Sequence, residues 1–533
     1  MGAAGEDAVA ADRLPVVYVR GFAGTTSGIN EQVDDPFYGF NLGSTHVRVG
    51  GSGEPLFHQF ESPLLRLILD EGYQLLVEGS QADYLDGQDD GSVPPASIWI
   101  HRYYDVSAST WGHKPQEFSL ERAAEDLLEL IELLERKTGA AGVHLVAHSM
   151  GGMICRSLIQ KIIPDRRPDR AASDYVARLF TYGTPHGGIE FDVGFGLLER
   201  LRDATGFAGA DVFGPRRMYE YLTPERELDP GGPPDGWNPL EIPDEVFPND
   251  RIFCLVGTNP HDYGAALGLS AKAVGEKSDG LVQIDNAYVR GARSGFVHRS
   301  HSGRYGMVNS EEGYQNLRRF LFGDLAVRAE LVGLELSGDD PDIIWQAETR
   351  LSVRGLPIVM HEQLAAHHCP IQLHPPAGAD GSDPGAAGTG TTFPGTAGLG
   401  AAGEPVALVT TYLSSAAHRP TDAMRYMLQL RVLSLRQHGS SFRFFDHLEQ
   451  AADFDDVLVV DVAHRDAGLT AWAAWKSQLP VPLRDYRPDG PPLNDADDAV
   501  EAWQVDVPLA DNARRFLGSG AAVRLSAAPR GSW

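Results

Sequence analysis

The 533-residue chain has little of three features that would point to a particular class of protein: cysteine, positive charge and long apolar runs. Its three cysteines, Cys155, Cys254 and Cys369, are far apart in the sequence, so neither a disulfide framework nor a zinc site is expected. Lysine and arginine number 45 against 73 acidic residues, and the net charge of −28 argues against binding to nucleic acid or to an anionic membrane. No run approaches the roughly 20 apolar residues that a membrane-spanning helix needs.

The N-terminal segment 1–11 also lacks the apolar core of a signal peptide, and it carries Glu6 and Asp7. Together with the low cysteine content, this predicts a soluble protein of the reducing cytoplasm. Hydrophobic residues make up 42% of the chain and charged residues 22%, which is typical of a globular protein. The length indicates two or three folded units.

The first part of the chain alternates short apolar runs with helical patterns, which is typical of an α/β domain with a mostly parallel sheet. We assign residues 1–325 to this domain. The clearest helix follows Ser119, an expected N-cap, and ends at Gly139. Further helices are expected at 151–163, ended by Pro164, and at 311–322. The expected strands are 14–19, 97–103, 143–147, 179–182, 251–256 and 281–284.

Two further regions depart from this alternation. Residues of about 187–248 combine apolar side chains with a tail rich in Pro, Gly and Asp, which indicates a cap or insertion. Residues 326–533 show the two-residue period of half-buried strands and are expected to form a β-rich, sandwich-like accessory domain. Within it, residues of about 375–404 are almost entirely Gly, Ala, Pro, Thr and Asp, and we expect a disordered loop there.

The strongest local signal is the segment 143–152, which predicts a strand that runs directly into a helix. A nucleophilic serine on such a sharp turn has an exposed hydroxyl, and the residues two positions before and after it must be small. Ala147 and Gly151 fill these positions around Ser149. Met150 then offers its backbone N–H at the helix start, where a developing oxyanion is stabilised. We expect His148 to line the pocket wall and not to act as a base.

A serine hydroxyl is inert at neutral pH unless a base takes its proton and an acid orients that base. In such folds the acid and then the histidine follow the nucleophile along the chain, on loops after late strands. Asp279 and His301 occupy those places, and we predict them to be the acid and the base. The sequence leaves open His298 as the base and Asp285 or Asp262 as the acid.

The end of the first expected strand offers the other half of an oxyanion hole. Two glycines, Gly21 and Gly24, let backbone N–H groups of this turn approach a ligand closely. Phe22 is the expected second donor beside Met150, and Ala23 is the alternative.

These segments together resemble the esterase and lipase branch of the α/β-hydrolases, in particular the GPI-inositol deacylase-like and triacylglycerol lipase-like families. The resemblance implies an α/β-hydrolase fold with Ser149 as nucleophile, Asp279 as acid and His301 as base. It places Phe22 and Met150 at the oxyanion-hole positions. Arg20 stands where these families usually have a histidine that braces the oxyanion loop. The resemblance covers about residues 14–323, and the segments that carry it are 20–22, 147–152, 182–188 and 278–282, with His301 behind them.

The expected function is therefore hydrolysis of a carboxylic ester or lipid, a small-molecule substrate, through an acyl-enzyme. No metal, cofactor or nucleic acid is expected to take part. The apolar content of residues 187–201 predicts an acyl pocket and a preference for medium or long chains. Two other functions stay open: an acyltransferase that uses the same three residues, and a hydrolase-fold binding protein without activity.

Overall fold

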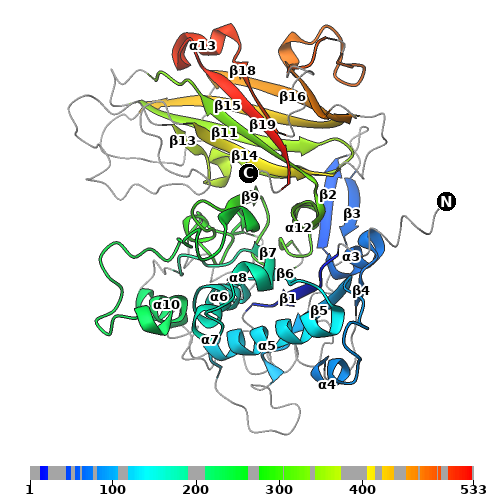
Figure 1. Ribbon diagram of the computed structural model, residues 1–533. Coiled ribbons are helices and arrows are strands. Elements are labelled where there is room, and N and C mark those ends of the chain that lie inside the picture. The colour runs from blue at the N-terminus through cyan, green and yellow to red at the C-terminus, as the bar shows by residue number, and fades with distance from the viewer. Residues whose placement is uncertain are drawn as a thin grey trace, which may run out of the picture. The chain divides into compact units, whose positions relative to one another are not determined.

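The fold was analysed in a computed structural model, in which the chain divides into two compact units (Figure 1). Unit 1 comprises residues 1–293 and 299–317, and unit 2 comprises residues 294–298 and 318–533. Within the described residues, no helix combines the length and the apolar character needed to cross a membrane. The structure describes residues 13–21, 44–49, 55–60, 63–75, 81–105, 118–189, 211–261, 275–303, 305–336, 343–373, 405–414, 423–436, 452–465, 468–488, 490–493 and 502–530.

The strands β4-β5-β1-β6-β7-β8, in this order, form the sheet at the centre of unit 1, and all of their pairs are parallel. Every residue of β1, β5, β6 and β8 is buried, because the strands of a parallel sheet are covered on both faces. This confirms the expected α/β class. The strands are β1 (Val16–Val19), β4 (Gln74–Leu75), β5 (Ser97–His101), β6 (Val143–His148), β7 (Val176–Tyr182) and β8 (Ile252–Gly257), and the next strand, β9 (Arg293–Val297), belongs to unit 2 apart from Arg293.

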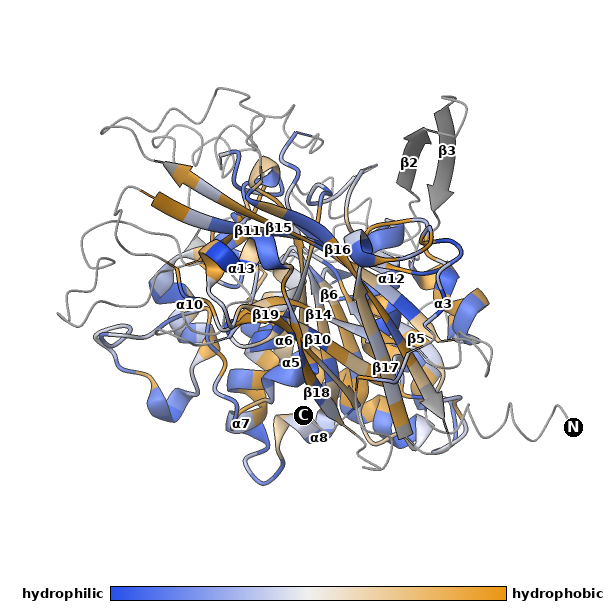
Figure 2. Cartoon of the chain, turned by 90° about the horizontal axis from the view of Figure 1, so that it is seen from above, coloured by the Kyte–Doolittle hydropathy of each residue, from blue (hydrophilic) through white to orange (hydrophobic). Residues whose placement is uncertain are grey.

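Helix α5 (Leu120–Thr138) buries one face, whereas every residue of α6 (Met150–Ser157) is buried. In α5 the Ser119 side chain accepts the N–H of Arg122, and Gly139 ends the helix at φ 70°, as the sequence predicts. Figure 2 shows hydrophilic and hydrophobic residues in alternation along α5. Helix α5 packs against α4 and α6, and α6 packs against β1, β6 and β7. The other helices are α3 (Pro63–Glu71), α4 (Gln81–Asp86), α6 (Met150–Ser157), α7 (Ile163–Arg166), α8 (Ala172–Tyr175), α10 (Pro215–Leu222) and α12 (Glu311–Phe322).

The prediction that Pro164 ends the helix after the elbow is wrong. The helix begins at Met150, widens into a π-helical turn at Leu158–Ile162 and continues as α7. The Ile163 N–H donates to the Leu158 carbonyl five residues earlier, which places Pro164 in the first turn of the next helical segment. A proline is tolerated there because that position needs no N–H donor.

The strand expected at 281–284 is absent, and the chain forms a turn followed by a 3₁₀ helix at Ile284–Asn286. The Asp279 carboxylate accepts the N–H groups of Leu281 and Val282, so the segment folds around this side chain and does not extend. The sequence analysis also missed a two-stranded antiparallel sheet of β2 (Ser44–Val49) and β3 (Pro55–Phe60).

Unit 2 contains two antiparallel sheets, which confirms the expected β-rich domain. One has the order β14-β10-β19-β18, and the other has β12-β11-β15-β16-β17 with β13 paired to β11. The segment 375–404 lies outside the described residues. The strands are β10 (Leu325–Val332), β11 (Ile343–Val353), β12 (His361–Gln363), β13 (Ile371–Leu373), β14 (Val406–Leu413), β15 (Met424–Arg436), β16 (Phe454–Arg465), β17 (Gly468–Trp475), β18 (Trp503–Pro508) and β19 (Ala522–Pro529). The short helix α13 (Asp511–Leu517) lies between β18 and β19 in the chain.

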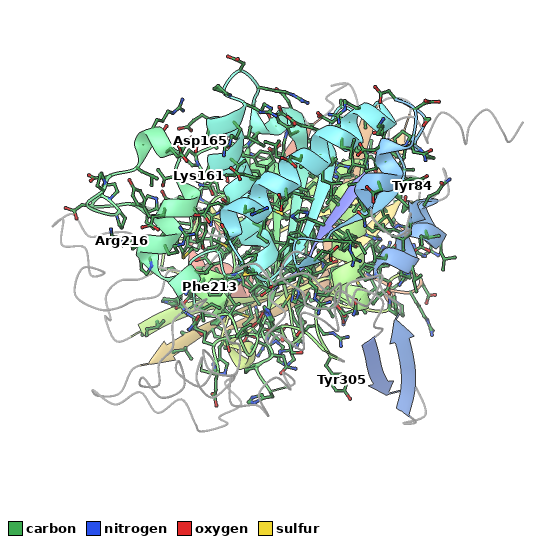
Figure 3. All side chains as sticks on the ribbon, turned by 90° about the horizontal axis from the view of Figure 1, so that it is seen from below. Tyr84, Lys161, Asp165, Phe213, Arg216 and Tyr305 are labelled. Carbon is green, nitrogen blue, oxygen red and sulfur yellow. The ribbon has the colours of Figure 1, made fainter. Side chains whose placement is uncertain are left out.

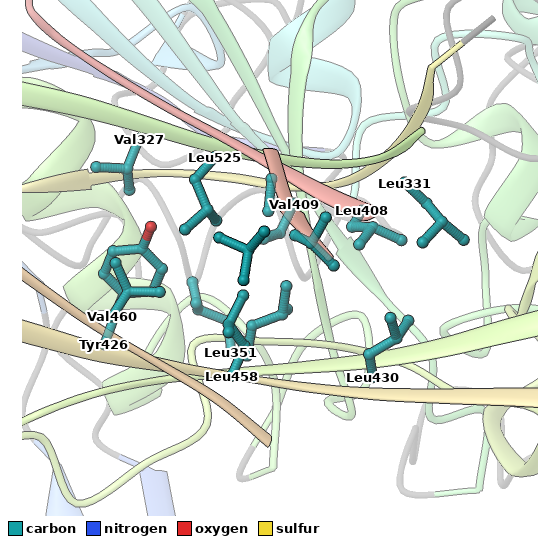
Figure 4. Close-up of a cluster of buried hydrophobic side chains, with 14 of the residues drawn as sticks. Val327, Leu331, Leu351, Leu408, Val409, Tyr426, Leu430, Leu458, Val460 and Leu525 are labelled. Atoms are coloured by element: carbon teal, nitrogen blue, oxygen red, sulfur yellow. The ribbon is translucent and has the colours of Figure 1, made fainter. Parts of the chain in front are cut away.

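Alternate residues of these strands form one hydrophobic core between the two sheets. Val327 and Leu525 come from one sheet, and Leu430 and Leu458 face them from the other (Figure 4). The alternation that the sequence shows in residues 327–331 and 428–432 therefore marks the inward face of each sheet.

Candidate active site

Ser149 lies alone between the last residue of β6 and the first residue of α6. Its backbone has φ 54° and ψ −129°, and among the described non-glycine residues only Ser149 and His368 have positive φ. The Ser149 N–H donates to the Tyr182 carbonyl at 2.9 Å, and the Ser149 carbonyl accepts the Thr184 hydroxyl at 2.9 Å. The surrounding chain thus holds a strained turn that presents the serine side chain.

The residues around the turn must be small because neighbouring chain segments approach them closely. A Cβ atom at Gly151 would lie 2.2 Å from the Val19 carbonyl oxygen, and one at Gly152 would lie 2.2 Å from the Thr184 Oγ1. A Cβ at Gly21 would lie 2.6 Å from the Ser149 Cβ. The end of β1 therefore passes directly beside the Ser149 side chain.

The structure brings Ser149, His301 and Asp279 into one hydrogen-bonded line. Ser149 Oγ lies 3.0 Å from His301 Nε2, and His301 Nδ1 lies 2.8 Å from Asp279 Oδ2. Since a carboxylate only accepts hydrogen bonds, Nδ1 carries the imidazole proton and leaves Nε2 as an acceptor for the serine hydroxyl. This arrangement can move the serine proton to His301.

The acid and the base are also held by their backbones. The His301 N–H donates to the Asp279 carbonyl at 2.9 Å, and Asp279 Oδ1 accepts the N–H of Val282 at 2.8 Å. Gly183, at φ 50°, gives them room, since a Cβ there would lie 2.8 Å from Asp279 Oδ2. Asp279 and His301 are only 1% and 2% exposed, so their geometry is fixed by protein groups and not by solvent.

The structure gives the alternative residues other partners. The His298 ring stacks on the His367 ring with centroids 3.7 Å apart, and Lys277 Nζ donates to Asp285 Oδ2 at 2.7 Å. Met150 is the first residue of α6, where backbone N–H groups have no partner within the helix. Three candidates, Phe22, Ala23 and Asp262, lie outside the described residues.

Buried cysteine and histidine side chains offer no second nucleophile among the described residues. His186 Nε2 lies 3.6 Å from Cys254 Sγ and 3.2 Å from Thr181 Oγ1. Burial lowers the pKa of His186 well below its usual value and raises the pKa of the Cys254 thiol, so the pair stays neutral. No group of three or more His, Cys, Asp or Glu side chains in the described part of the chain is arranged to hold a metal ion.

Tyr103, which follows β5, contacts the residues just after β1, next to the position where Phe22 is expected to bind an oxyanion. Its hydroxyl lies 2.6 Å from the Arg20 carbonyl and 3.1 Å from the Gly21 carbonyl, and the side chain is buried. The Tyr103 hydroxyl thus supplies a side-chain hydrogen bond to the backbone at Arg20 and Gly21. The sequence analysis missed it because no motif marks a tyrosine 83 positions away.

For the ester hydrolysis that the sequence analysis expects, we predict that Tyr103→Phe lowers kcat about 10-fold with a smaller change in KM, because loosening the turn of the expected oxyanion donor weakens transition-state binding. Steady-state kinetics and the thermal midpoint Tm of both proteins would measure this. An unchanged kcat would show that the Tyr103 hydroxyl does not support catalysis.

Arg156 of α6 anchors the described part of the segment that the sequence analysis assigned to a cap. Its fully buried guanidinium donates to the carbonyls of His186, Pro239 and Glu241 at 3.1, 2.7 and 3.1 Å. Farther along the same helix, Lys161 and Asp165 lie one turn apart (Figure 3). Lys161 Nζ donates to the Thr223 carbonyl, and the Asp165 carboxylate accepts the Glu225 N–H. The helix that follows Ser149 therefore also binds the described part of this segment through hydrogen bonds to its backbone.

Comparison with known proteins bears on the same region. A family model described as Lipase (class 2) matches residues 99–167, which run from the third residue of β5 through α5 and β6 to the helix after Ser149. The solved structure of the lin2722 gene product from Listeria innocua is similar at 13% identity, covering 58% of this chain and 94% of that chain. Its TM-score of 0.26 is too low to support any inference. No curated protein matches the chain.

The class 2 lipase match ends before Asp279 and His301, so it covers the nucleophile turn and not the other two residues. The matched residues include the whole strand β6, the turn at Ser149 and the helix that follows it, and β6 lies at the centre of the parallel sheet. The segment around Ser149 is therefore similar to class 2 lipases over the matched residues.

Proposed function

We propose that the protein hydrolyses carboxylic esters, including lipid esters, through a covalent acyl-enzyme on Ser149. The observation that carries this proposal is the continuous hydrogen-bonded line Ser149–His301–Asp279 at a strained strand-to-helix turn. Nucleophile, base and acid in this arrangement are the groups that acyl transfer needs.

In the first step, Ser149 Oγ attacks the ester carbonyl carbon while His301 Nε2 takes the hydroxyl proton. Asp279 stabilises the imidazolium that forms, and the negative charge on the carbonyl oxygen is held by backbone N–H groups, for which we propose Met150 and Phe22. The C–O bond then breaks, and the alcohol leaves with the proton from His301.

In the second step, a water molecule attacks the acyl-enzyme and gives its proton to His301. The bond between Ser149 Oγ and the acyl carbon breaks, the carboxylic acid leaves, and the serine recovers its proton. Three buried free thiols among the described residues are compatible with a reducing compartment, and we propose the cytoplasm as the site of action.

A fluorophosphonate probe followed by peptide mapping tests this function, because labelling requires an activated and accessible serine. We expect one label, on the peptide that contains Ser149, and hydrolysis of nitrophenyl esters with a preference for medium or long acyl chains. A label on another serine, or no label and no hydrolysis, would contradict the proposal. Faster transfer of the acyl group to an added alcohol than to water would assign the same residues to acyl transfer.

A further inference from the structure

Each polar group of His301, in its backbone and in its ring, is held by a defined partner. Asp279 binds two of them, the backbone N–H through its carbonyl and the ring Nδ1 through its carboxylate. Ser149 binds the ring Nε2. The fourth group, the His301 carbonyl, lies 3.0 Å from Nε2 of His148. Three of the four contacts thus come from the proposed catalytic residues themselves, and the fourth comes from the residue next to the nucleophile.

His148 can only be the donor in its contact with His301. A carbonyl oxygen accepts and never donates, so the proton of His148 lies on Nε2. The His148 side chain is nearly buried, and its ring packs beside the His301 ring with centroids 4.8 Å apart. Burial, the neighbouring His301 and Arg20 all lower the pKa of His148 well below its usual value. His148 therefore stays neutral and adds no positive charge beside the imidazolium that forms during the reaction.

The position of His148 in the sheet links this contact to the distance between Ser149 and His301. His148 is the last residue of β6, and Ser149 follows it directly, so one strand end reaches both the backbone and the side chain of His301. The loop that carries His301 includes Gly303 at φ 87° and is not part of a helix or strand. A contact from β6 to the His301 carbonyl fixes this loop to the element that also fixes the serine.

We propose that His148 is a positioning residue that sets the distance between Ser149 and His301 by holding the base loop through the His301 carbonyl. The proposal rests on the proposed serine mechanism for its catalytic consequence. It replaces the expectation that His148 only lines the pocket wall.

Kinetic comparison of three variants tests the catalytic part. His148→Phe keeps a ring but removes the donor, and we expect kcat for nitrophenyl esters to fall about 10- to 100-fold, while KM changes less than about 2-fold. His148→Gln keeps an N–H donor at similar reach and should recover most of the rate. The matched control is His144→Phe, which removes another buried histidine at the far end of the same strand and should lower Tm without changing kcat.

Hydrogen exchange of the peptide that contains residues 300–303 tests the structural part without any substrate. We expect faster amide exchange in this peptide in His148→Phe than in the unaltered protein, His148→Gln or His144→Phe. Equal exchange, a kcat within 2-fold of the unaltered protein, or failure of His148→Gln to recover the rate would overturn the proposal. If the unaltered protein cleaves no ester but His148→Phe still loosens this loop, the positioning role holds and the proposed reaction fails.

Discussion

Ser149→Ala is expected to lower kcat for ester hydrolysis by on the order of 10⁶-fold, to the residual rate that binding and the oxyanion donors alone provide. The substitution removes the one atom that attacks the carbonyl. Alanine has the same Cβ as serine, so the positive φ of the turn costs no more than before, and Tm should change little. Kinetics with a nitrophenyl ester and labelling by the fluorophosphonate probe would both measure the loss.

Ser157→Ala is the matched control for this substitution. Ser157 is also a buried serine and lies on the same helix α6, one residue after Arg156. It should keep full activity and full labelling, because its hydroxyl lies on no path to His301. A folded Ser149→Ala protein that still cleaves esters would contradict the assignment of the nucleophile.

Asp279→Asn is expected to lower kcat about 10⁴-fold with little change in fold. The amide oxygen can keep the hydrogen bonds from Leu281 and Val282, which turns the NH₂ group toward His301 Nδ1. Nδ1 must then accept, so the ring proton moves to Nε2, and Nε2 can no longer take the proton of Ser149. The rate constant kcat measured near neutral pH would report this loss.

Asp285→Asn separates this effect from a general loss of negative charge. Asp285 lies six residues after Asp279 and pairs with Lys277, so its substitution should leave kcat within about 2-fold. A decrease of less than 10-fold in Asp279→Asn, or an equal decrease in Asp285→Asn, would contradict the role proposed for Asp279.

The sequence predicts those features of unit 1 that depend on local patterns. The apolar face of α5, its N-cap Ser119 and the small residues around Ser149 follow from spacing alone, and the structure agrees with each. The order of nucleophile, acid and histidine along the chain was enough to select Asp279 and His301 as candidates. Spacing could not separate His301 from His298, because only the path of the loop decides which ring faces the serine.

Other features depend on contacts between distant segments and leave no trace in a local pattern. Tyr103 contacts the Gly21 carbonyl, and His148 contacts the His301 carbonyl. Because every residue has a backbone carbonyl, no pattern of side chains in the sequence could reveal either contact. The π-helical turn before Pro164 was missed because proline normally ends a helix. Here the hydrogen bond from the Ile163 N–H to the Leu158 carbonyl, five residues earlier, lets the helix continue past the proline. The turn at 281–284 replaced a strand because the Asp279 carboxylate takes its N–H groups.

The close approach of the backbone at the nucleophile turn determines which positions can be diversified in the laboratory. At Gly151 the obstacle to a larger residue is a main-chain oxygen, so no second substitution elsewhere can relieve it, and selection from a random library should return glycine. At Gly152 the three nearest atoms all belong to the side chain of Thr184, including its Cβ at 2.8 Å, so only glycine at position 184 would remove all three, and it would also remove the hydroxyl that binds the Ser149 carbonyl. A larger residue at position 152 is therefore expected only together with a change at position 184, and glycine should return when position 152 is varied alone.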